Sequence, residues 1–377
     1  MRIAIDATAL PPRHRGVANY TTNLVANLPG VDRRNDYVVF CKASDVALLA
    51  NGPEVTLVPV AVATRPHRLL WEQLVLPGLL RRHRIDVLHS PHFTAPLAAG
   101  TCRRVVTVHD LAVYRHPESH AFVKRPYFRS MIRAARRADR IVTLAPSVRG
   151  DVVSTLGVPA DRVDVVPHGV DASFRPLDEH APAGRALTDY GLTHPFALYV
   201  GELSARKNLE RLIEAAERLA SSIPLMIALV GPAGRGAGRL RTRIAASPLR
   251  SRIRVMGYVP PSDLIALYRA ADVFVYPSLY EGFGLPVLEA MACGTPVVIS
   301  DRPAMTEVAS DAALRFEATS AEALADALAT ILLHEDVRCG LRARARGRAR
   351  EFTWRRTAEL TRDAYERAMS LPRTQGG

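Results

Sequence analysis

The chain has 377 residues and a formal net charge of +13, with 50 lysines and arginines against 37 aspartates and glutamates. This length accommodates two domains, and a hydrophobic share of 48% is enough for two buried cores. No apolar run approaches the roughly 18 residues of a membrane-spanning helix. The four scattered cysteines lack metal-binding spacing and no signal-peptide pattern precedes the first strand, so we expect a cytoplasmic protein with reduced thiols.

Apolar, β-branched runs alternate with helical patterns along the chain. In the first half, strands are predicted at 2–8, 36–41, 55–62, 85–90, 103–109 and 140–145. The pattern restarts in the second half, with strands predicted at 196–201, 225–230, 253–259 and 273–277. Strands that alternate with helices form parallel, doubly wound sheets. We therefore predict an α/β protein with two Rossmann-like domains, separated by a polar linker near 172–192.

The most informative stretch follows the strand predicted at 273–277. Gly282 and Gly284 break that strand, Pro286 suits the start of a helix, and Gly294 is expected to end it. A strand, a glycine turn and a helix in succession direct backbone N–H groups and the helix dipole toward a bound phosphate.

Two glutamates accompany this turn, Glu281 in the loop and Glu289 in the first turn of the predicted helix. A glycosidase would need both carboxylates to flank one bond, which is disfavoured because Glu289 lies beside the predicted phosphate. A helix start with solvated acids is the alternative that geometry alone leaves open.

Arg206 and Lys207 lie between the strand predicted at 196–201 and a helical pattern at 209–220. Cations are unfavourable at the positive end of a helix dipole, and a bound diphosphate would relieve this conflict. Lysine would act as a mobile point charge and arginine as a planar fork. The pair therefore predicts a diphosphate site.

Polar residues also follow strands of the first half. Gly16 lies in a loop between the first strand and a helical pattern at 20–28, a position that directs backbone amides at a crevice. His89, His92 and His109 lie at the ends of two predicted strands, where parallel sheets bind ligands. For His89 and His92, a structural hydrogen bond to a neighbouring carbonyl is the open alternative.

Three basic stretches account for much of the positive charge. Residues 65–84 surround an apolar centre with basic side chains, and helical spacing relates Arg129, Arg133, Arg136, Arg137 and Arg140. Both stretches suit an anionic membrane surface, and ordinary surface helices are the alternative. Residues 338–350 hold six arginines, but no recognised nucleic-acid module accompanies them, so we expect no nucleic-acid partner.

Several motifs resemble those of retaining glycosyltransferases of family 4. The segment E-G-F-G-L-P-V-L-E, from Glu281 to Glu289, resembles the family's glutamate-x7-glutamate signature, and A-M-A-C-G-T-P-V-V follows it. The segment G-E-L-S-A-R-K-N at 201–208 is similar to the family's diphosphate motif, although Glu202 stands where many members have arginine. The T-V-H-D strand end matches the family's donor-site histidine at His109.

The resemblance covers nearly the whole chain, is strongest over 196–309, and implies the GT-B fold, in which two Rossmann-like domains face a central cleft. It implies an N-terminal acceptor-binding domain at 1–180 and a C-terminal domain for a nucleoside diphosphate-sugar at 190–352. Residues 353–377 would form a helix that crosses back to the N-terminal domain.

The resemblance also implies a set of site residues. The catalytic residues are His109, Glu281, Lys207 and Arg206. The donor-binding residues are Gly16, Tyr258, Val259, Gly282, Phe283, Gly284, Leu285 and Glu289. In this scheme the two cations and the glycine turn hold the diphosphate, and Glu289 binds the ribose. Glu281 and His109 contact the transferred sugar, while Tyr258 and Val259 frame the nucleobase.

The chain contains no D-x-D motif, so we expect catalysis without a metal or other cofactor. Retention of anomeric configuration is implied by the family. The motifs look most like those of bacterial mannosyl- and rhamnosyltransferases, which favours GDP-mannose as donor, with UDP- or dTDP-sugars as alternatives. The acceptor would be a glycan, a lipid-linked oligosaccharide or a small molecule, and the enzyme could work peripherally on the inner face of the cell membrane.

Two other functions are kept as alternatives. A sugar-nucleotide 2-epimerase shares the fold and would turn over its donor without an acceptor. A non-catalytic polyanion-binding protein would bind lipid or nucleic acid with steep salt dependence and ignore sugar nucleotides.

Overall fold

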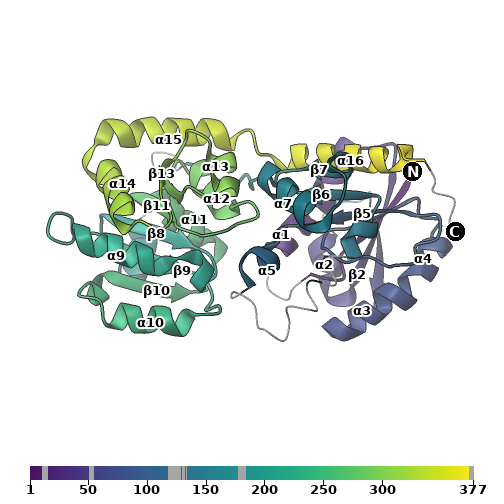
Figure 1. The fold of residues 1–377 in the computed structure, drawn as a ribbon, viewed down its shortest axis with the longest axis horizontal. Coiled ribbons are helices and arrows are strands. Elements are labelled where there is room, and N and C mark those ends of the chain that lie inside the picture. Colours follow the sequence, from purple (N-terminus) through teal and green to yellow (C-terminus); the bar gives the residue numbers. More distant parts are fainter. Residues whose placement is uncertain are drawn as a thin grey trace. The chain divides into compact units, whose positions relative to one another are not determined.

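The computed structural model describes residues 1–10, 16–50, 55–117, 129, 132, 134–176 and 184–372. It divides into two compact units (Figure 1). The first comprises Met1–Leu111, Val123–Gly169 and Thr353–Gly377, and the second comprises Ala112–Phe122 and Val170–Phe352. Each unit contains one parallel sheet, which confirms the predicted α/β class with two Rossmann-like halves.

The first unit is built on a seven-stranded parallel sheet in the order β3-β2-β1-β4-β5-β6-β7. Its strands are β1 (Arg2–Asp6), β2 (Asp36–Lys42), β3 (Val55–Val60), β4 (Val87–Ser90), β5 (Arg103–Thr107), β6 (Arg140–Thr143) and β7 (Val163–Val165). Strand order reverses between β1 and β4, and open α/β sheets bind ligands at such a switch point, beyond the carboxyl ends of the strands.

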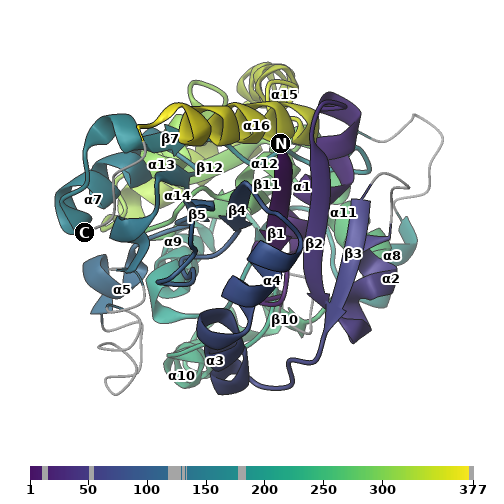
Figure 2. The ribbon, with the colours of Figure 1, turned by 90° about the vertical axis from the view of Figure 1, so that its right-hand side faces the viewer.

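Helices flank this sheet. They are α1 (Val17–Val31), α2 (Val46–Leu49), α3 (Arg65–Leu74), α4 (Leu76–Arg82), α7 (Pro146–Leu156) and α16 (Trp354–Ser370), with short 3-10 turns at Ala43–Asp45, Ala135–Arg137 and Ala160–Arg162. Although α16 follows the second unit in the chain, it packs against α1 and strands β4 to β6 of the first (Figure 2).

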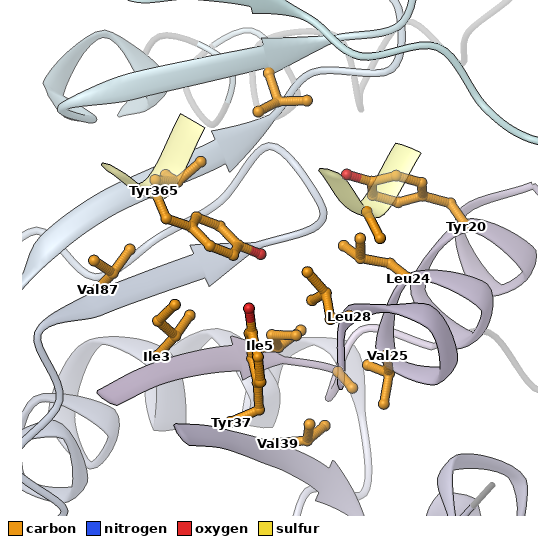
Figure 3. Close-up of a cluster of buried hydrophobic side chains, with 14 of the residues drawn as sticks. Ile3, Ile5, Tyr20, Leu24, Val25, Leu28, Tyr37, Val39, Val87 and Tyr365 are labelled. Carbon is orange, nitrogen blue, oxygen red and sulfur yellow. The ribbon is translucent and has the colours of Figure 1, made fainter. Parts of the chain in front are cut away.

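The core of the first unit joins α16 to β1 and α1. Tyr365 of α16 projects among buried side chains that include Ile3 and Val87 (Figure 3). Its hydroxyl group is 2.7 Å from Nδ1 of His89, whose Nε2 is 2.8 Å from the hydroxyl oxygen of Thr107. Both ring nitrogens of His89 are therefore used inside the core, and burial lowers the pKa of His89 to about 3. His89 therefore has a structural role. Its hydrogen-bond partners are the side chains of Tyr365 and Thr107, and not the neighbouring carbonyl that we expected for a structural histidine.

The second unit contains a six-stranded parallel sheet in the order β10-β9-β8-β11-β12-β13. Its strands are β8 (Phe196–Val200), β9 (Met226–Val230), β10 (Ile253–Gly257), β11 (Val273–Tyr276), β12 (Val297–Ser300) and β13 (Leu314–Phe316). The switch point here lies between β8 and β11. Strands β8 to β11 match the sequence prediction, whereas β12 and the three-residue β13 were not among the predicted strands.

The helices of the second unit also follow the doubly wound pattern. They are α5 (Ala112–Arg115), α8 (Gly184–Asp189), α9 (Leu209–Leu219), α10 (Ala237–Ala245), α11 (Pro261–Ala270), α12 (Leu285–Ala292), α13 (Pro303–Ala309), α14 (Ala321–Leu333) and α15 (Glu335–Ala349), with 3-10 turns at Ala205–Lys207 and Arg250–Arg252. Helix α8 lies within the segment predicted as a linker, so that prediction was incomplete. Among the described residues, no helix is long and apolar enough to span a bilayer.

The structure corrects our interpretation of the basic stretches. Arg140 lies in β6, where it is buried and binds Asp164 through two hydrogen bonds of 2.9 and 2.6 Å. It therefore cannot share an exposed helical stripe with Arg136 and Arg137, which form part of a separate 3-10 turn. Arg133 lies outside the described residues.

The arginines of α15 also have structural partners. Arg348 donates to the carbonyl oxygens of Glu307 and Val308, at 2.8 and 2.9 Å, and Arg344 donates to that of Asp311 at 3.1 Å. The last carbonyls of a helix carry partial negative charge, so arginines from α15 stabilise the end of α13. These contacts explain part of the arginine run without a nucleic-acid partner.

Candidate active site

The site in the second unit begins where β11 ends at Tyr276. Gly284 has a φ of 95°, a left-handed conformation that favours glycine, and α12 starts at the next residue with Pro286 in its first turn. Gly294 follows the helix with a φ of 78°. The predicted succession of strand, glycine turn, helix and terminal glycine is thus present at the switch point of this sheet.

A buried charge triad of Arg206, Lys207 and Glu281 lies at this point. Lys207 forms an ion pair with Oε1 of Glu281, and Arg206 Nη1 is 3.3 Å from Oε2 of the same carboxylate. Lys207 is only 6% exposed, and its Nζ also donates to the hydroxyl group of Tyr276 at 3.0 Å. The triad carries a net charge of +1, which suits an anionic ligand.

The backbone holds the triad in place. Arg206 donates a hydrogen bond to the carbonyl oxygen of Tyr280, and its own carbonyl accepts one from Leu279 N at 2.9 Å. Asn208 adopts a left-handed φ of 56° and donates from its side chain to the carbonyl oxygens of Pro277 and Ala318. The loops after β8 and β11 are therefore joined to each other on both sides of the ion pairs.

These cations keep Glu281 ionised. Burial alone would raise its pKa, but the charges of Lys207 and Arg206 outweigh burial and lower the pKa of Glu281 to about 2. The carboxylate is therefore negative at every physiological pH.

Glu289 has the opposite electrostatic environment. It is the fifth residue of α12 and so lies in the second turn, not the first as we expected. Its Oε2 accepts a hydrogen bond of 2.8 Å from the hydroxyl group of Tyr268. Burial raises the pKa of Glu289 to about 7, against the effect of this hydrogen bond and with a further contribution from Asp171. Glu289 therefore changes charge near neutral pH.

The other predicted donor-binding residues of the second unit differ in their exposure. Tyr258 follows β10 and has a 65% exposed side chain, whereas its neighbour Val259 is buried. Phe283 is buried with its ring 5.9 Å from that of Phe352, and Leu285 is the first residue of α12. Gly282, which separates Glu281 from Phe283 in the chain, is buried.

Two predicted site residues belong to the first unit. Gly16 precedes α1 with a φ of 50°, and its carbonyl accepts a hydrogen bond from Tyr20 N. The rest of the predicted loop, 11–15, lies outside the described residues. His109 follows β5, and its Nε2 is 2.9 Å from the carbonyl oxygen of Pro91. Burial lowers the pKa of His109, which favours the neutral ring.

The tyrosines that bind the site residues were not predicted from the sequence. Tyr268 binds Glu289 and Tyr276 binds Lys207, but in the sequence both resemble ordinary core residues.

A group of three residues in the first unit was not predicted either. The ligand atoms of Asp6, Glu72 and His92 lie within 4.8 Å of one another. The spacing of Arg68 and Glu72 on one helix was the available signal, because residues four apart share a helix face.

The triad makes a prediction about acid stability. Glu281 has a folded pKa of about 2 against an ordinary value of 4.5, so its contribution is present above pH ~4.5 and is lost as pH falls toward 2. Glu281→Gln should therefore lower the free energy of unfolding by about 3 kcal/mol at neutral pH. Between neutral and acidic pH, the free energy of unfolding should fall less in this variant than in the wild type. Urea unfolding from about pH 7 to about pH 3 measures both effects.

Glu210→Gln is the matched control, because Glu210 pairs with Arg239 at an exposed position. It should change the free energy of unfolding by less than about 1 kcal/mol. Equal losses in the two variants would contradict the buried ion-pair account of Glu281.

Comparison with known proteins places these observations in a family. Residues 189–352 match the model of "Glycosyl transferases group 1", and residues 14–174 match that of "Glycosyltransferase Family 4". The chain is 30% identical over 348 residues to O-antigen chain mannosyltransferase B of Escherichia coli, covering 91% of this chain and 88% of that protein.

Solved structures show the same fold. A glycosyltransferase from Rickettsia africae superposes with a TM-score of 0.76 at 17% identity, covering 98% of this chain and 99% of that one. HepE from Anabaena, in complex with UDP and glucose, superposes with a TM-score of 0.75 at 19% identity, covering 96% and 98%. Together with the two parallel sheets, these matches show the GT-B fold. The chain is a glycosyltransferase of family 4, and its second half belongs to glycosyl transferases group 1.

Proposed function

We propose that this enzyme is a retaining, metal-independent glycosyltransferase that moves a hexose from a nucleoside diphosphate-sugar to a glycan, lipid-linked or small-molecule acceptor. The observation that carries the proposal is the buried triad of Arg206, Lys207 and Glu281 at the switch point of the second sheet, beside the start of α12. Among relatives, an Escherichia coli O-antigen protein is named a mannosyltransferase, which favours mannose and GDP-mannose. The HepE complex with UDP keeps UDP-sugars, and with them dTDP-sugars, as alternatives.

The diphosphate is the proposed ligand of the two cations. Both already share one carboxylate, so the triad retains one net positive charge for the incoming phosphates. The backbone from Gly282 to Leu285 and the dipole of α12 add further positive potential. Because charge grows on the diphosphate as it leaves, these groups stabilise the transition state without a metal ion.

The remaining groups are assigned to the rest of the donor. Glu289 accepts hydrogen bonds from the ribose hydroxyls, while Tyr258 and Val259 frame the base, and Gly16 approaches the phosphates. Glu281 orients the hydroxyls of the transferred sugar, and His109 contacts that sugar. The buried, fully ionised carboxylate of Glu281 suits this orienting role because it accepts hydrogen bonds at any physiological pH.

A second observation supports contact with an anionic membrane. Leu70, Leu74 and Val75 are 60%, 75% and 47% exposed on and beside α3, and Leu97, which is 53% exposed, bonds through its N–H to the side chain of Gln73. Helices α3 and α4 also carry exposed arginines, namely Arg65, Arg81 and Arg82. Apolar side chains beside arginines suit the boundary between acyl chains and anionic headgroups, so we propose peripheral binding at the inner face of the cell membrane.

The donor proposal is tested by thermal unfolding with GDP, UDP, dTDP and ADP, with and without EDTA. A ligand that binds only the folded state raises the melting temperature, so one nucleotide should raise it by several degrees regardless of EDTA. Lys207→Met should abolish the shift, whereas Lys42→Met, in the first unit, should keep it. Loss of the shift with EDTA would refute metal independence. A response to nucleic acid or anionic vesicles alone would indicate a polyanion-binding protein.

The elevated pKa of Glu289 predicts pH-dependent donor binding. An ionised carboxylate accepts both ribose hydroxyls, and the pKa of about 7 means that protonation competes below neutrality. GDP-mannose, whose diphosphate does not titrate in this range, should bind about tenfold more weakly at pH ~6 than at pH ~8. Calorimetric titration of Glu289→Gln should give weak binding without that slope, while the surface variant Glu322→Gln should retain it. A slope that survives in Glu289→Gln would exclude Glu289 as its source.

Membrane contact is tested with vesicles that contain phosphatidylglycerol. At low salt the wild type should sediment with them and Leu70→Ser/Leu74→Ser should bind at least about tenfold more weakly, because two leucines no longer enter the bilayer boundary. Leu333→Ser removes a leucine of similar exposure, 63%, from the second unit and should have no effect. Unchanged binding of the double variant would contradict the proposed surface.

A further inference from the structure

A buried ionic cluster occupies the switch point of the first sheet. We use this name for Asp6, Arg68, Glu72, His92 and Thr94, which are between 0% and 9% exposed. Asp6 ends β1, Arg68 and Glu72 lie on α3, and His92 and Thr94 follow β4. Two carboxylates are costly to bury, so their partners must be accounted for.

Arg68 joins the two sides of the cluster. Its Nη1 donates to Oε2 of Glu72 at 2.8 Å and lies 3.8 Å from Oδ2 of Asp6. Its Nη2 donates to the hydroxyl oxygen of Thr94 at 3.0 Å. The guanidinium therefore links α3 to the loop after β4 and places a positive charge between two carboxylates.

His92 connects Thr94 to Asp6. Its Nδ1 accepts a hydrogen bond of 3.4 Å from the backbone N–H of Thr94 and lies 2.9 Å from the hydroxyl oxygen of the same residue. That hydroxyl group also donates to Oε2 of Glu72 at 2.6 Å. Nε2 of His92 is 3.3 Å from Oδ2 of Asp6, so the ring lies between the loop after β4 and the end of β1.

This arrangement is better explained by ions than by a metal site. Asp6, Glu72 and His92 have suitable spacing for a metal ligand set. Arg68 already supplies positive charge there, however, because its Nη1 lies 2.8 Å from Oε2 of Glu72 and 3.8 Å from Oδ2 of Asp6.

The cluster is connected to His109 through one residue. Pro91 precedes His92, and its carbonyl oxygen lies 2.9 Å from Nε2 of His109. A carbonyl only accepts, so Nε2 of His109 carries the proton and Nδ1 of the neutral ring is an acceptor. On the other side, Asp6 Oδ1 accepts from the N–H and hydroxyl groups of Thr8, at 3.0 and 2.6 Å, which holds the carboxylate to its own loop.

We propose that the buried ionic cluster positions His109. By holding the segment from Pro91 to Thr94 against β1 and α3, it keeps the Pro91 carbonyl in place and so selects the His109 tautomer whose Nδ1 accepts a hydrogen bond from a hydroxyl group of the transferred sugar. This inference rests on the proposed glycosyltransferase function. Arg68, Glu72, His92 and Thr94 are positioning residues in this scheme, since they act on the sugar only through His109.

The test compares Thr94→Val, which removes the shared hydroxyl group, and Glu72→Gln, which removes one charge, with Thr94→Ser, which keeps the hydroxyl. Nitrogen-15 NMR of labelled histidines reports the tautomer of His109 in ligand-free protein. The His109 signal is assigned as the one that is missing from the spectrum of His109→Gln. Thr94→Val and Glu72→Gln should reduce the Nε2-protonated form and lower kcat by about tenfold or more with a smaller change in donor KM. Thr94→Ser should keep the wild-type His109 tautomer and the wild-type kcat. The NMR measurement needs no sugar nucleotide, so it can fail independently of the proposed function.

Asp164→Asn is the matched control, because Asp164 is another buried carboxylate in the first unit, paired with Arg140. It should lower the melting temperature without changing the His109 tautomer. If Thr94→Val and Glu72→Gln behave in the same way, the cluster is only structural and the proposal is wrong. The proposal is also overturned if Mn²⁺ or Zn²⁺ raises the melting temperature of the wild type but not of Glu72→Gln, because the cluster would then be a metal site.

Discussion

The ion pair between Lys207 and Glu281 is the constraint on which the second unit's site depends. A lysine that is 6% exposed is stable only with a counter-charge, and Glu281 lies within reach only if the chain turns back directly after β11. The bond from Arg206 to the carbonyl of Tyr280 and those from Asn208 to Pro277 and Ala318 fix that turn. The left-handed Gly284 then starts α12 beside the ion pair. One local structure therefore packs the turn, pairs the buried charges and presents the proposed ligand-binding groups.

Several of the arginines that the structure describes have structural partners. Arg140 and Arg103 pair with aspartates of the first unit, and Arg348 of α15 binds two carbonyls at the end of α13. A net charge therefore says little about partners until each cation's neighbours are known. The arginines of α3 and α4 differ, because Arg65, Arg81 and Arg82 are exposed on helices that also expose Leu70 and Leu74.

The sequence predicted the features that depend on local chemistry. Alternating apolar runs indicated the parallel strands, and Gly284, Pro286 and Gly294 marked the turn and both ends of α12, because their backbone preferences act within a few residues. The pairing of Tyr268 with Glu289, or of Thr94 with Glu72, joins elements that are distant in the chain, and no local pattern indicates which side chains will meet. Arg140 was assigned to a helical stripe although a strand was also predicted from residue 140, because the helical spacing of arginines continued into the start of β6.

A crystal structure of the enzyme with GDP-mannose, or with the nucleotide sugar that stabilises it most, would test the proposed donor site directly. We predict diphosphate oxygens within hydrogen-bond distance of Arg206, Lys207 and the backbone from Gly282 to Leu285, with the ribose hydroxyls on Glu289 and no metal ion between the phosphates and the protein. A diphosphate bound elsewhere, or held through a metal ion while Lys207 and Glu281 remain paired only with each other, would contradict it.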